Sequence, residues 1–275
     1  MRVTDSRHLS ATRITAAIGV ELTGLDLRRP PTPELAAVLQ EGVDRHHVIV
    51  VRDQFLDARQ LQSVAESFGP IMFSPVQRAI GSTTAVSMIE DTAERPPAGF
   101  GWHTDLSWTT KPAALGLLTA VTIPPYGGDT LWASTAAVFD NLSDADRRRC
   151  EVLTTMHAPD TTLLASIERH HGGAVADRLR AQNPPIEHAL VRAHPTTGRR
   201  SVFLSPLYVR PLVGPRWEHN ALMQRLHTML DDPHVQMRWR WRQGDLVIWD
   251  ETSTCHRALA DHHPQRRVMR RCVTN

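Results

Sequence analysis

The sequence predicts an α+β fold with a mainly β core and helices around it. Short runs of β-branched and apolar residues recur between turn signals, which is typical of a sandwich or barrel. Amphipathic helical patterns interrupt these runs. The 275 residues show no internal repeat and no linker of biased composition, so we expect one domain over 1–275.

The N-terminal part mixes strand and helix patterns. Apolar and polar residues alternate first, and later they recur at helical spacing. Pro33 stands near the first turn of one such helix, where its missing N–H costs nothing. We expect two short strands in 13–27, a helix over 33–45, a buried strand over 47–52 and a second helix over 57–68.

Strand patterns dominate from about residue 71 onward. We expect strands at 84–89, 114–123, 129–133, 190–194, 201–205 and 245–250. Helices are expected at 135–150, 161–181 and 215–231. The stretch 158–188 is polar and rich in Arg and His, and we interpret it as a mobile lid or insertion.

The composition argues against several classes of protein. The 31 Lys and Arg residues nearly balance the 29 Asp and Glu residues, which disfavours nucleic acid or a membrane surface as partner. Three cysteines do not form a disulfide framework. The chain has no apolar leader and no apolar stretch long enough to span a membrane, so we expect a soluble, cytoplasmic protein.

The segment Trp102-His103-Thr104-Asp105 offers a pair of metal ligands. In an extended strand, residues two apart face the same side, so His103 and Asp105 would converge on one point. A third, distant His would complete a facial triad and leave metal positions open for an oxidant and a co-substrate. Because the chain has 15 histidines, the short motif also fits a surface strand with a His–Asp hydrogen bond.

His256 is the candidate for the third ligand. It follows the buried strand expected at 245–250 and a polar turn that begins at Asp250. A histidine in this place lies at the mouth of a barrel, where ligand sites occur. An ordinary loop histidine is the alternative.

Arginines crowd the C-terminal run QRRVMRRCV. Alternation places Arg267, Met269 and Arg271 on one face of a strand, while Val268 and Cys272 suggest that the other face is apolar. An inward guanidinium must pair with an anion, because an unpaired buried charge is very costly. The periodicity leaves open whether this face points to water or to a carboxylate.

A turn rich in proline and glycine, PPYGGD, precedes Thr130. The hydroxyl of this threonine can share a carboxylate with an arginine. Plain turn chemistry explains the same residues equally well.

Taken in this order, the motifs closely resemble the taurine dioxygenase/TfdA family of Fe(II)/2-oxoglutarate-dependent dioxygenases. The resemblance covers most of the chain and rests on IGVELTGLDL, VIVVRDQ, ESFG, WHTDLSW, PPYGGDTLWAS, HPTTGRRSVF, WRQGDLVIWD and PQRRVMRR. It implies a double-stranded β-helix, the jelly roll of clavaminate synthase-like proteins, with helices packed outside.

The resemblance also implies a function for each candidate residue. His103, Asp105 and His256 would bind iron, and Thr130 and Arg267 would bind the distal carboxylate of 2-oxoglutarate. Such an enzyme uses O2 and 2-oxoglutarate to oxidise a C–H bond and releases succinate and CO2. Retention of the carboxylate of Asp105 favours hydroxylation, and relatives are commonly homo-oligomers.

The substrate is expected to be a small organic acid with an apolar body. Family members that act on taurine carry a His after the FG turn, but this chain reads FGPIMFSPV there, so taurine is disfavoured. Arg271 matches a position that pairs with the anionic group of the substrate in relatives. Phe73, Trp102 and Trp108 are candidates for an aromatic pocket, with a plain core role as the alternative.

One departure from the family lies before the distal histidine. The family often reads WDNR there, whereas this chain has Asp250-Glu251-Thr252. We therefore expect different hydrogen bonds around His256.

Two other functions fit part of the pattern. A His/Asp/His site also suits Zn²⁺ in a hydrolase. A hydrolase, however, needs a general base that the sequence does not place, and it leaves Thr130 and Arg267 unexplained. A non-catalytic jelly-roll binding module with structural histidines is the second alternative.

Overall fold

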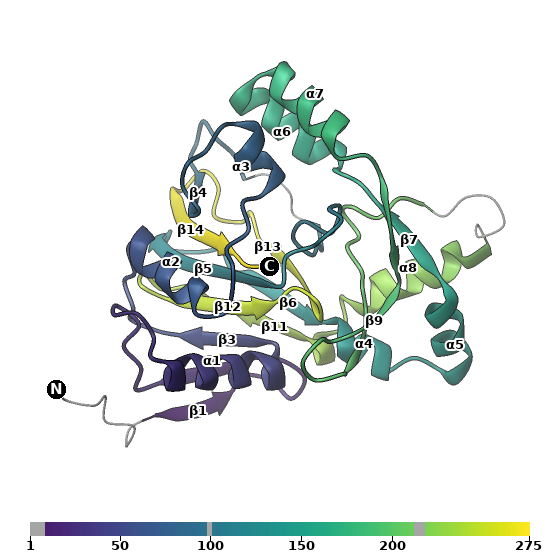
Figure 1. Cartoon of the computed structure of the whole chain (residues 1–275), viewed down its shortest axis with the longest axis horizontal. Helices are drawn as coiled ribbons and strands as arrows, with labels where there is room; N and C mark the ends of the chain where they lie inside the picture. Colours follow the sequence, from purple (N-terminus) through teal and green to yellow (C-terminus); the bar gives the residue numbers. More distant parts are fainter. Residues whose placement is uncertain (1–8, 98–100, 212–217) are drawn as a thin grey trace.

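A seven-stranded sheet runs through the computed structural model, which describes residues 9–97, 101–211 and 218–275 (Figure 1). Its strands lie in the order β1 (Ser10–Arg13), β2 (Val20–Thr23), β3 (Val48–Val51), β12 (Leu246–Asp250), β5 (Leu115–Thr122), β14 (Arg267–Val273) and β4 (Ser87–Asp91). β2 and β3 are parallel, and the other neighbours are antiparallel. The central strands are apolar and buried on both faces, as their β-branched sequences predict.

A three-stranded sheet packs against the large one. It has the order β11 (Gln236–Trp239), β6 (Thr130–Ser134) and β13 (Thr254–Ala258). The rings of Trp132 in β6 and Trp249 in β12 meet between the two sheets, with centroids 5.7 Å apart. Large apolar residues from both sheets fill this layer, so their inward faces form one core.

Helices α1 (Pro33–His46) and α2 (Ala58–Glu66) cover the outer face of the large sheet (Figure 1). Thr32 caps α1 by accepting a hydrogen bond from the backbone N–H of Leu35, and Pro33 occupies its first turn. Leu39 and Val43 of α1 pack in one cluster with Ile49 of β3. Both predicted N-terminal helices are thus confirmed.

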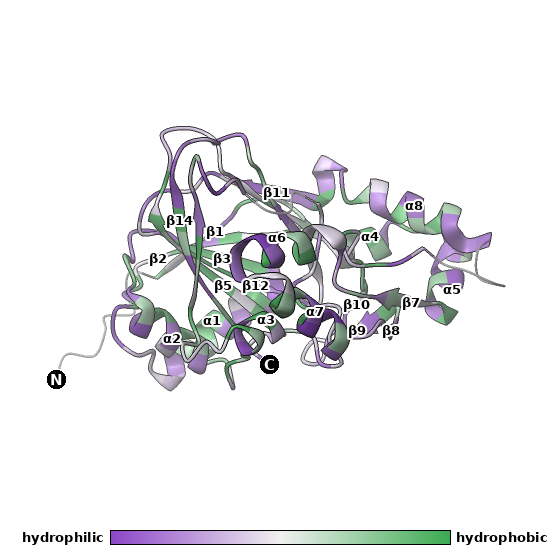
Figure 2. Cartoon of the chain, turned by 90° about the horizontal axis from the view of Figure 1, so that it is seen from above, coloured by the Kyte–Doolittle hydropathy of each residue, from purple (hydrophilic) through white to green (hydrophobic). Residues whose placement is uncertain are grey.

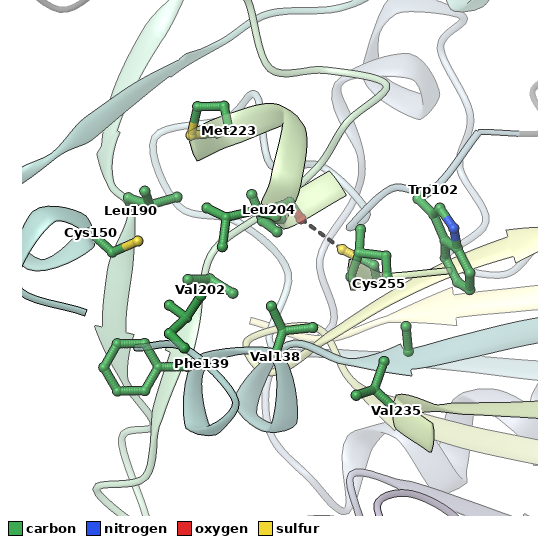
Figure 3. Close-up of a cluster of buried hydrophobic side chains, with 14 of the residues drawn as sticks. Trp102, Val138, Phe139, Cys150, Leu190, Val202, Leu204, Met223, Val235 and Cys255 are labelled. Carbon is green, nitrogen blue, oxygen red and sulfur yellow. Dashed lines mark hydrogen bonds between the residues drawn. The ribbon is translucent and has the colours of Figure 1, made fainter. Parts of the chain in front are cut away.

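A third apolar cluster fills the space beside the small sheet. It joins α4 (Thr135–Asp140), α5 (Asp144–Val152) and α8 (Asn220–Met229) to the two-stranded ribbon of β9 (Val191–Ala193) and β10 (Arg200–Val202). Figure 3 shows this cluster, in which the Cys255 thiol donates a 2.8 Å hydrogen bond to the carbonyl of Leu204. Trp102 lies at its edge (Figure 3).

Two helices, α6 (Thr161–His171) and α7 (Gly173–Gln182), occupy the segment that we interpreted as a lid. They pack on α3 (Pro75–Ala79) and on a fourth apolar cluster through Leu164, Ile167, Ala176 and Leu179. Their outer sides are hydrophilic (purple in Figure 2). A lid role for 158–188 stays a prediction.

Several predicted boundaries differ from the structure. The helix expected at 135–150 is two helices because Ser143 caps α5, and the one expected at 161–181 is broken where Gly172 takes a φ of 87°. Strands β7 (Thr154–His157), β8 (Ile186–Ala189), β11 and β13 were not predicted, and β7 pairs with β8. Of the two strands expected in 13–27, β1 starts earlier, at Ser10. The start of the helix expected at 215–231 lies outside the described residues, and the rest is α8.

The mixed α/β composition is confirmed, while the jelly-roll topology stays a prediction. Within the described ranges, each helix is too short or too polar to cross a membrane.

Candidate active site

A cavity of about 320 Å³ opens between the two sheets. Its walls come from β4, β5, β12 and β14 of the large sheet, from β6 and β13 of the small sheet, and from α6. Six predicted site residues line it: His103, Asp105, Thr130, His256, Arg267 and Arg271.

Three of these side chains meet as the sequence predicts. One ligand atom each from His103, Asp105 and His256 lies within 4.8 Å of the others. Nε2 of His103 is 3.7 Å from Oδ1 of Asp105, and Nε2 of His256 is 3.9 Å from Oδ2. The chain therefore has a His-Asp-His triad in a geometry that suits a metal ion.

The backbone that positions the triad differs from the prediction. We expected His103 and Asp105 on one extended strand, but only His103 is paired, through an isolated bridge to His256, and Asp105 begins a turn. Leu106 then has a φ of 55°, so the chain leaves the strand direction. His256, which we expected after a polar turn at the mouth of a barrel, lies inside β13 and pairs with Trp132, so the alternative of an ordinary loop histidine is wrong.

Hydrogen bonds hold the two metal-facing groups in place. Nδ1 of His103 is 2.9 Å from the carbonyl of Gly101, which leaves Nε2 as the free ligand atom. Glu251 accepts a 2.9 Å bond from the backbone N–H of Asp105 and a 2.7 Å bond from the indole of Trp249. The buried carboxyl of Glu251 thereby connects the strand β12 to the turn that carries Asp105.

The charges around the triad favour ionised aspartate and neutral histidine. Burial alone would raise the pKa of Asp105, but the guanidinium of Arg271 and the two histidines lower it below the usual range. Nη2 of Arg271 is 2.6 Å from Oδ2 of Asp105. Burial, aided by His103, lowers the pKa of His256 to about 3. The histidine thus keeps a lone pair for a metal at neutral pH.

A second polar group lies deeper in the cavity. Arg267 is 4% exposed, and its Nε donates a 3.1 Å bond to the carbonyl of Gly128. The hydroxyl of Thr130 accepts a 2.9 Å bond from the indole of Trp241, so its own proton is free for another acceptor. Arg267 and Arg271 both line the cavity, and Arg270 instead donates to the carbonyl of Leu56. The inward orientation of the arginine face, which the periodicity left open, is thereby decided.

The three aromatic residues that we predicted for a substrate pocket lie outside this cavity. Trp108 is 2% exposed in the cluster beneath α6 and α7. Trp102 donates to Asp231 and stacks under Arg257. Phe73 lies in the segment before α3 and borders a separate surface depression. The described residues that line the cavity do not include these three, so we no longer propose that they bind the substrate.

The structure adds residues that the sequence reasoning missed. Tyr208, beside His103 with ring centroids 5.9 Å apart, and Asp91 at the end of β4 both line the cavity. Glu251 had one signal, its departure from the WDNR pattern. No sequence pattern distinguished Tyr208 or Asp91, because their positions depend on segments that meet only in the fold.

Comparisons with known proteins agree with this geometry. The family model of the taurine catabolism dioxygenase TauD, TfdA family, matches residues 7–273. The alpha-ketoglutarate-dependent sulfate ester dioxygenase of Pseudomonas putida is 29% identical over 94% of this chain and 86% of its own length. The alpha-ketoglutarate-dependent 2,4-dichlorophenoxyacetate dioxygenase of Burkholderia sp. (strain RASC) is 26% identical over 92% of this chain and 90% of its own length.

A solved structure is similar over almost the whole fold. The crystal structure of AAD-2 in complex with Mn(II) and N-oxalylglycine superposes with a TM-score of 0.81. The two proteins are 26% identical, and the match covers 97% of each chain. With its His-Asp-His metal-binding triad, the chain therefore belongs to the TauD/TfdA family of alpha-ketoglutarate-dependent dioxygenases.

Proposed function

We propose that the protein binds Fe(II) through His103, Asp105 and His256 and oxidises a C–H bond of a small anionic organic substrate. Alpha-ketoglutarate (2-oxoglutarate) and O2 are the co-substrates, and succinate and CO2 are released. One observation carries the proposal: the three ligand atoms, within 4.8 Å of one another, share a cavity with the inward Arg267. Hydroxylation is the outcome that we expect.

The donor set fits a metal of this kind. Two neutral imidazoles and one carboxylate on one side of an ion leave the other side open, as non-haem iron oxygenases need. Oδ2 of Asp105 pairs with Arg271, whereas Oδ1 lies 3.7 Å from Nε2 of His103, too far for a hydrogen bond, so a cation between these two atoms would satisfy both. Bound iron would supply the site at which O2 is activated, and the protein holds the ligands and excludes water.

Thr130 and Arg267 supply the groups that would bind the distal carboxylate of 2-oxoglutarate. A buried guanidinium with one hydrogen bond to a carbonyl retains donors for a carboxylate. The free proton of the Thr130 hydroxyl adds a second donor. We call Thr130 and Arg267 the co-substrate clamp. Such a clamp also favours the oxygenase over a zinc hydrolase, because a hydrolase does not bind 2-oxoglutarate.

The cavity supports an organic acid as substrate. Arg271 provides a positive charge beside the triad, and Met88, Ile89 and Leu118 provide apolar wall. Leu163 of α6 completes the wall, which is why we retain the lid proposal for 158–188. Relatives are named for sulfate esters and 2,4-dichlorophenoxyacetate, which combine an anionic group with an apolar body.

A substrate screen tests this class. Aryloxyalkanoates, alkyl sulfates and alkyl sulfonates are incubated with Fe(II), 2-oxoglutarate and the protein, and substrate-dependent succinate release is measured. We expect activity with acids that carry an apolar body. Activity on taurine alone would contradict the proposal.

Loss of one ligand tests the metal. His103→Ala should lower oxygen uptake and succinate release by at least about a hundredfold, because a bidentate remnant holds iron poorly. His234→Ala, on a side chain that is 89% exposed, is the matched control. A zinc hydrolase or a binding module would show no iron-dependent oxygen uptake in the unmutated protein.

The co-substrate clamp has its own test. Arg267→Ala should raise the KM for 2-oxoglutarate about ten- to a hundredfold, because charge-assisted hydrogen bonds are lost, while metal binding persists. Arg266→Ala is the control, since Arg266 is exposed and pairs with Glu90. An unchanged KM in Arg267→Ala would mean that another residue binds the distal carboxylate of 2-oxoglutarate.

A further inference from the structure

The co-substrate arginine has a buried carboxylate and a buried imidazole beside it. Asp91 of β4 is the direct partner of Arg267 of β14 across the sheet. Its Oδ2 lies 3.8 Å from Nη1 of Arg267 and 3.3 Å from Nε2 of His262. All three residues are buried, with exposed fractions of 7%, 4% and 1% for Asp91, Arg267 and His262.

The loop before β6, which contains Gly128, and the loop before β14, which contains Asp261 and His262, fit tightly around this cluster. Gly128 has a φ of 70°, and a Cβ at this position would lie 3.0 Å from Cδ of Arg267 and 3.3 Å from Nδ1 of His262. Asp261 accepts a 2.8 Å bond from the N–H of Gly128 and so fixes the carbonyl to which Arg267 donates. Nδ1 of His262 is buried and has no hydrogen-bond partner among the described residues.

The charges of the cluster balance only while the co-substrate is absent. Asp91 and Arg267 form one pair of opposite charges. The distal carboxylate of 2-oxoglutarate would add one negative charge beside these buried groups. An excess buried charge is costly, and the site can remove it by binding one proton.

Some other charged groups near the cluster are paired, whereas Arg95 and His170 of α6 line the same cavity as Asp91 and Arg267. Asp129 is bound by Arg238 at 2.7 Å, and Glu90 turns outward to Arg266. Arg95, which is exposed and follows β4, lies near enough to lower the pKa of Asp91. Burial is nevertheless the largest influence and raises the pKa of Asp91 overall, which makes this carboxyl a ready proton acceptor.

We propose that Asp91 and His262 are positioning residues for the co-substrate that hold Arg267 in place, and that Asp91 takes up a proton when 2-oxoglutarate binds beside the arginine. The inference rests on the proposed role of Arg267 as the clamp. It predicts that the affinity for 2-oxoglutarate falls as the pH rises, by up to about tenfold per pH unit. The proton comes from solvent and is released with the co-substrate.

Calorimetry measures the proton directly. The full chain loaded with Mn(II) is titrated with 2-oxoglutarate at one near-neutral pH in phosphate and in Tris, whose heats of ionisation differ. We expect a buffer-dependent heat that corresponds to uptake of a large fraction of about one proton. A heat that does not depend on the buffer would overturn the proposal.

Variants identify the acceptor. Asp91→Asn keeps the shape of the side chain but removes the charge, so proton uptake should disappear and the affinity should become nearly independent of pH. Glu90→Gln removes the same charge one residue away and should leave the uptake unchanged. Proton uptake that persists in Asp91→Asn would contradict the inference.

A second variant guards against a folding defect. His262→Gln should also reduce the uptake, with Mn(II) affinity and thermal unfolding as checks of the fold. If both variants retained the uptake, the cluster would have no part in it. If Arg267→Ala left the affinity for 2-oxoglutarate unchanged, the clamp itself would be misplaced, which is a different failure from an intact clamp without proton uptake.

Discussion

At the scale of single residues, Asp105 is the point on which the site depends. Its carboxylate faces both histidines, its Oδ2 contacts Arg271, and its backbone N–H is held by Glu251. Burial, followed by the nearby charge of Asp105, raises the pKa of Glu251 well above its usual value. Two buried carboxyls therefore share the positive charge of one arginine, and only one of them faces the metal site.

Glu251→Gln tests the supporting carboxyl. The amide oxygen can replace one acceptor, but the amide nitrogen cannot accept the bond from either the N–H of Asp105 or the indole of Trp249. We expect metal affinity to fall about ten- to a hundredfold, as for other residues that orient metal ligands. Titration with Mn(II) measures this, and Glu41→Gln on the exposed side of α1 is the control. Unchanged affinity would show that the bond to Asp105 is dispensable.

At the scale of elements, the hydrophobic periodicity predicted features that depend on the sequence of one strand alone. Alternation placed Arg267 and Arg271 on one face of β14 but left the direction of that face open, whereas the buried run of β12 follows from its β-branched composition. The prediction of a strand through Asp105 was wrong because Leu106 adopts a left-handed conformation, which no local sequence pattern predicts. Likewise, the strand β13 forms only because β6 supplies a partner from more than 100 residues away.

The pairing of β5 with β12 offers a test at this scale. Gly116 faces Trp249 across the two strands, and a Cβ at Gly116 would lie 2.2 Å from the indole ring. Gly116→Ala must therefore displace the ring, and we expect a loss of about 1–3 kcal/mol in the free energy of unfolding. Metal affinity should fall as well, because the same indole anchors Glu251.

The control for this substitution is another glycine. At Gly173 in α7, the nearest atom to an added Cβ is a side-chain oxygen of Glu168 at 3.8 Å, so Gly173→Ala should be neutral or slightly stabilising. Urea unfolding of both variants measures the difference. Equal stability of the two would mean that Trp249 can move at little cost.

At the scale of the whole molecule, the metal centre joins parts that fold far apart in sequence. Residues 103–105 lie between β4 and β5, whereas His256 lies in the small sheet, and the bridge between the two histidines ties them together. The sequence could name the ligands because the family motifs around them are specific, although the short His-x-Asp pattern alone is not. It could not place Asp91, Glu251 or Tyr208, because their roles come from the way the two sheets and the loops between them pack.

The buried histidines predict how the metal-free protein responds to acid. His157 of β7 is fully buried between Phe203 and His188, and burial, aided by His188, lowers its pKa from 6.5 to about 3. Between about pH 6.5 and pH 3, the unfolded chain therefore binds a proton at this histidine, whereas the folded chain does not. The free energy of unfolding should fall with decreasing pH across this window, by up to about 1.4 kcal/mol per pH unit for this residue.

Substitution separates this contribution from those of other groups. His157→Gln cannot titrate, so its unfolding free energy should depend less steeply on pH than that of the unmutated protein over the same window. The amide can still bond the hydroxyl of Thr155, which lies 2.9 Å from Nε2 of the histidine. His234→Gln, at an exposed site, should leave the slope unchanged. Urea unfolding at a series of pH values measures both slopes, and an unaltered slope in His157→Gln would show that this imidazole is protonated equally in both states.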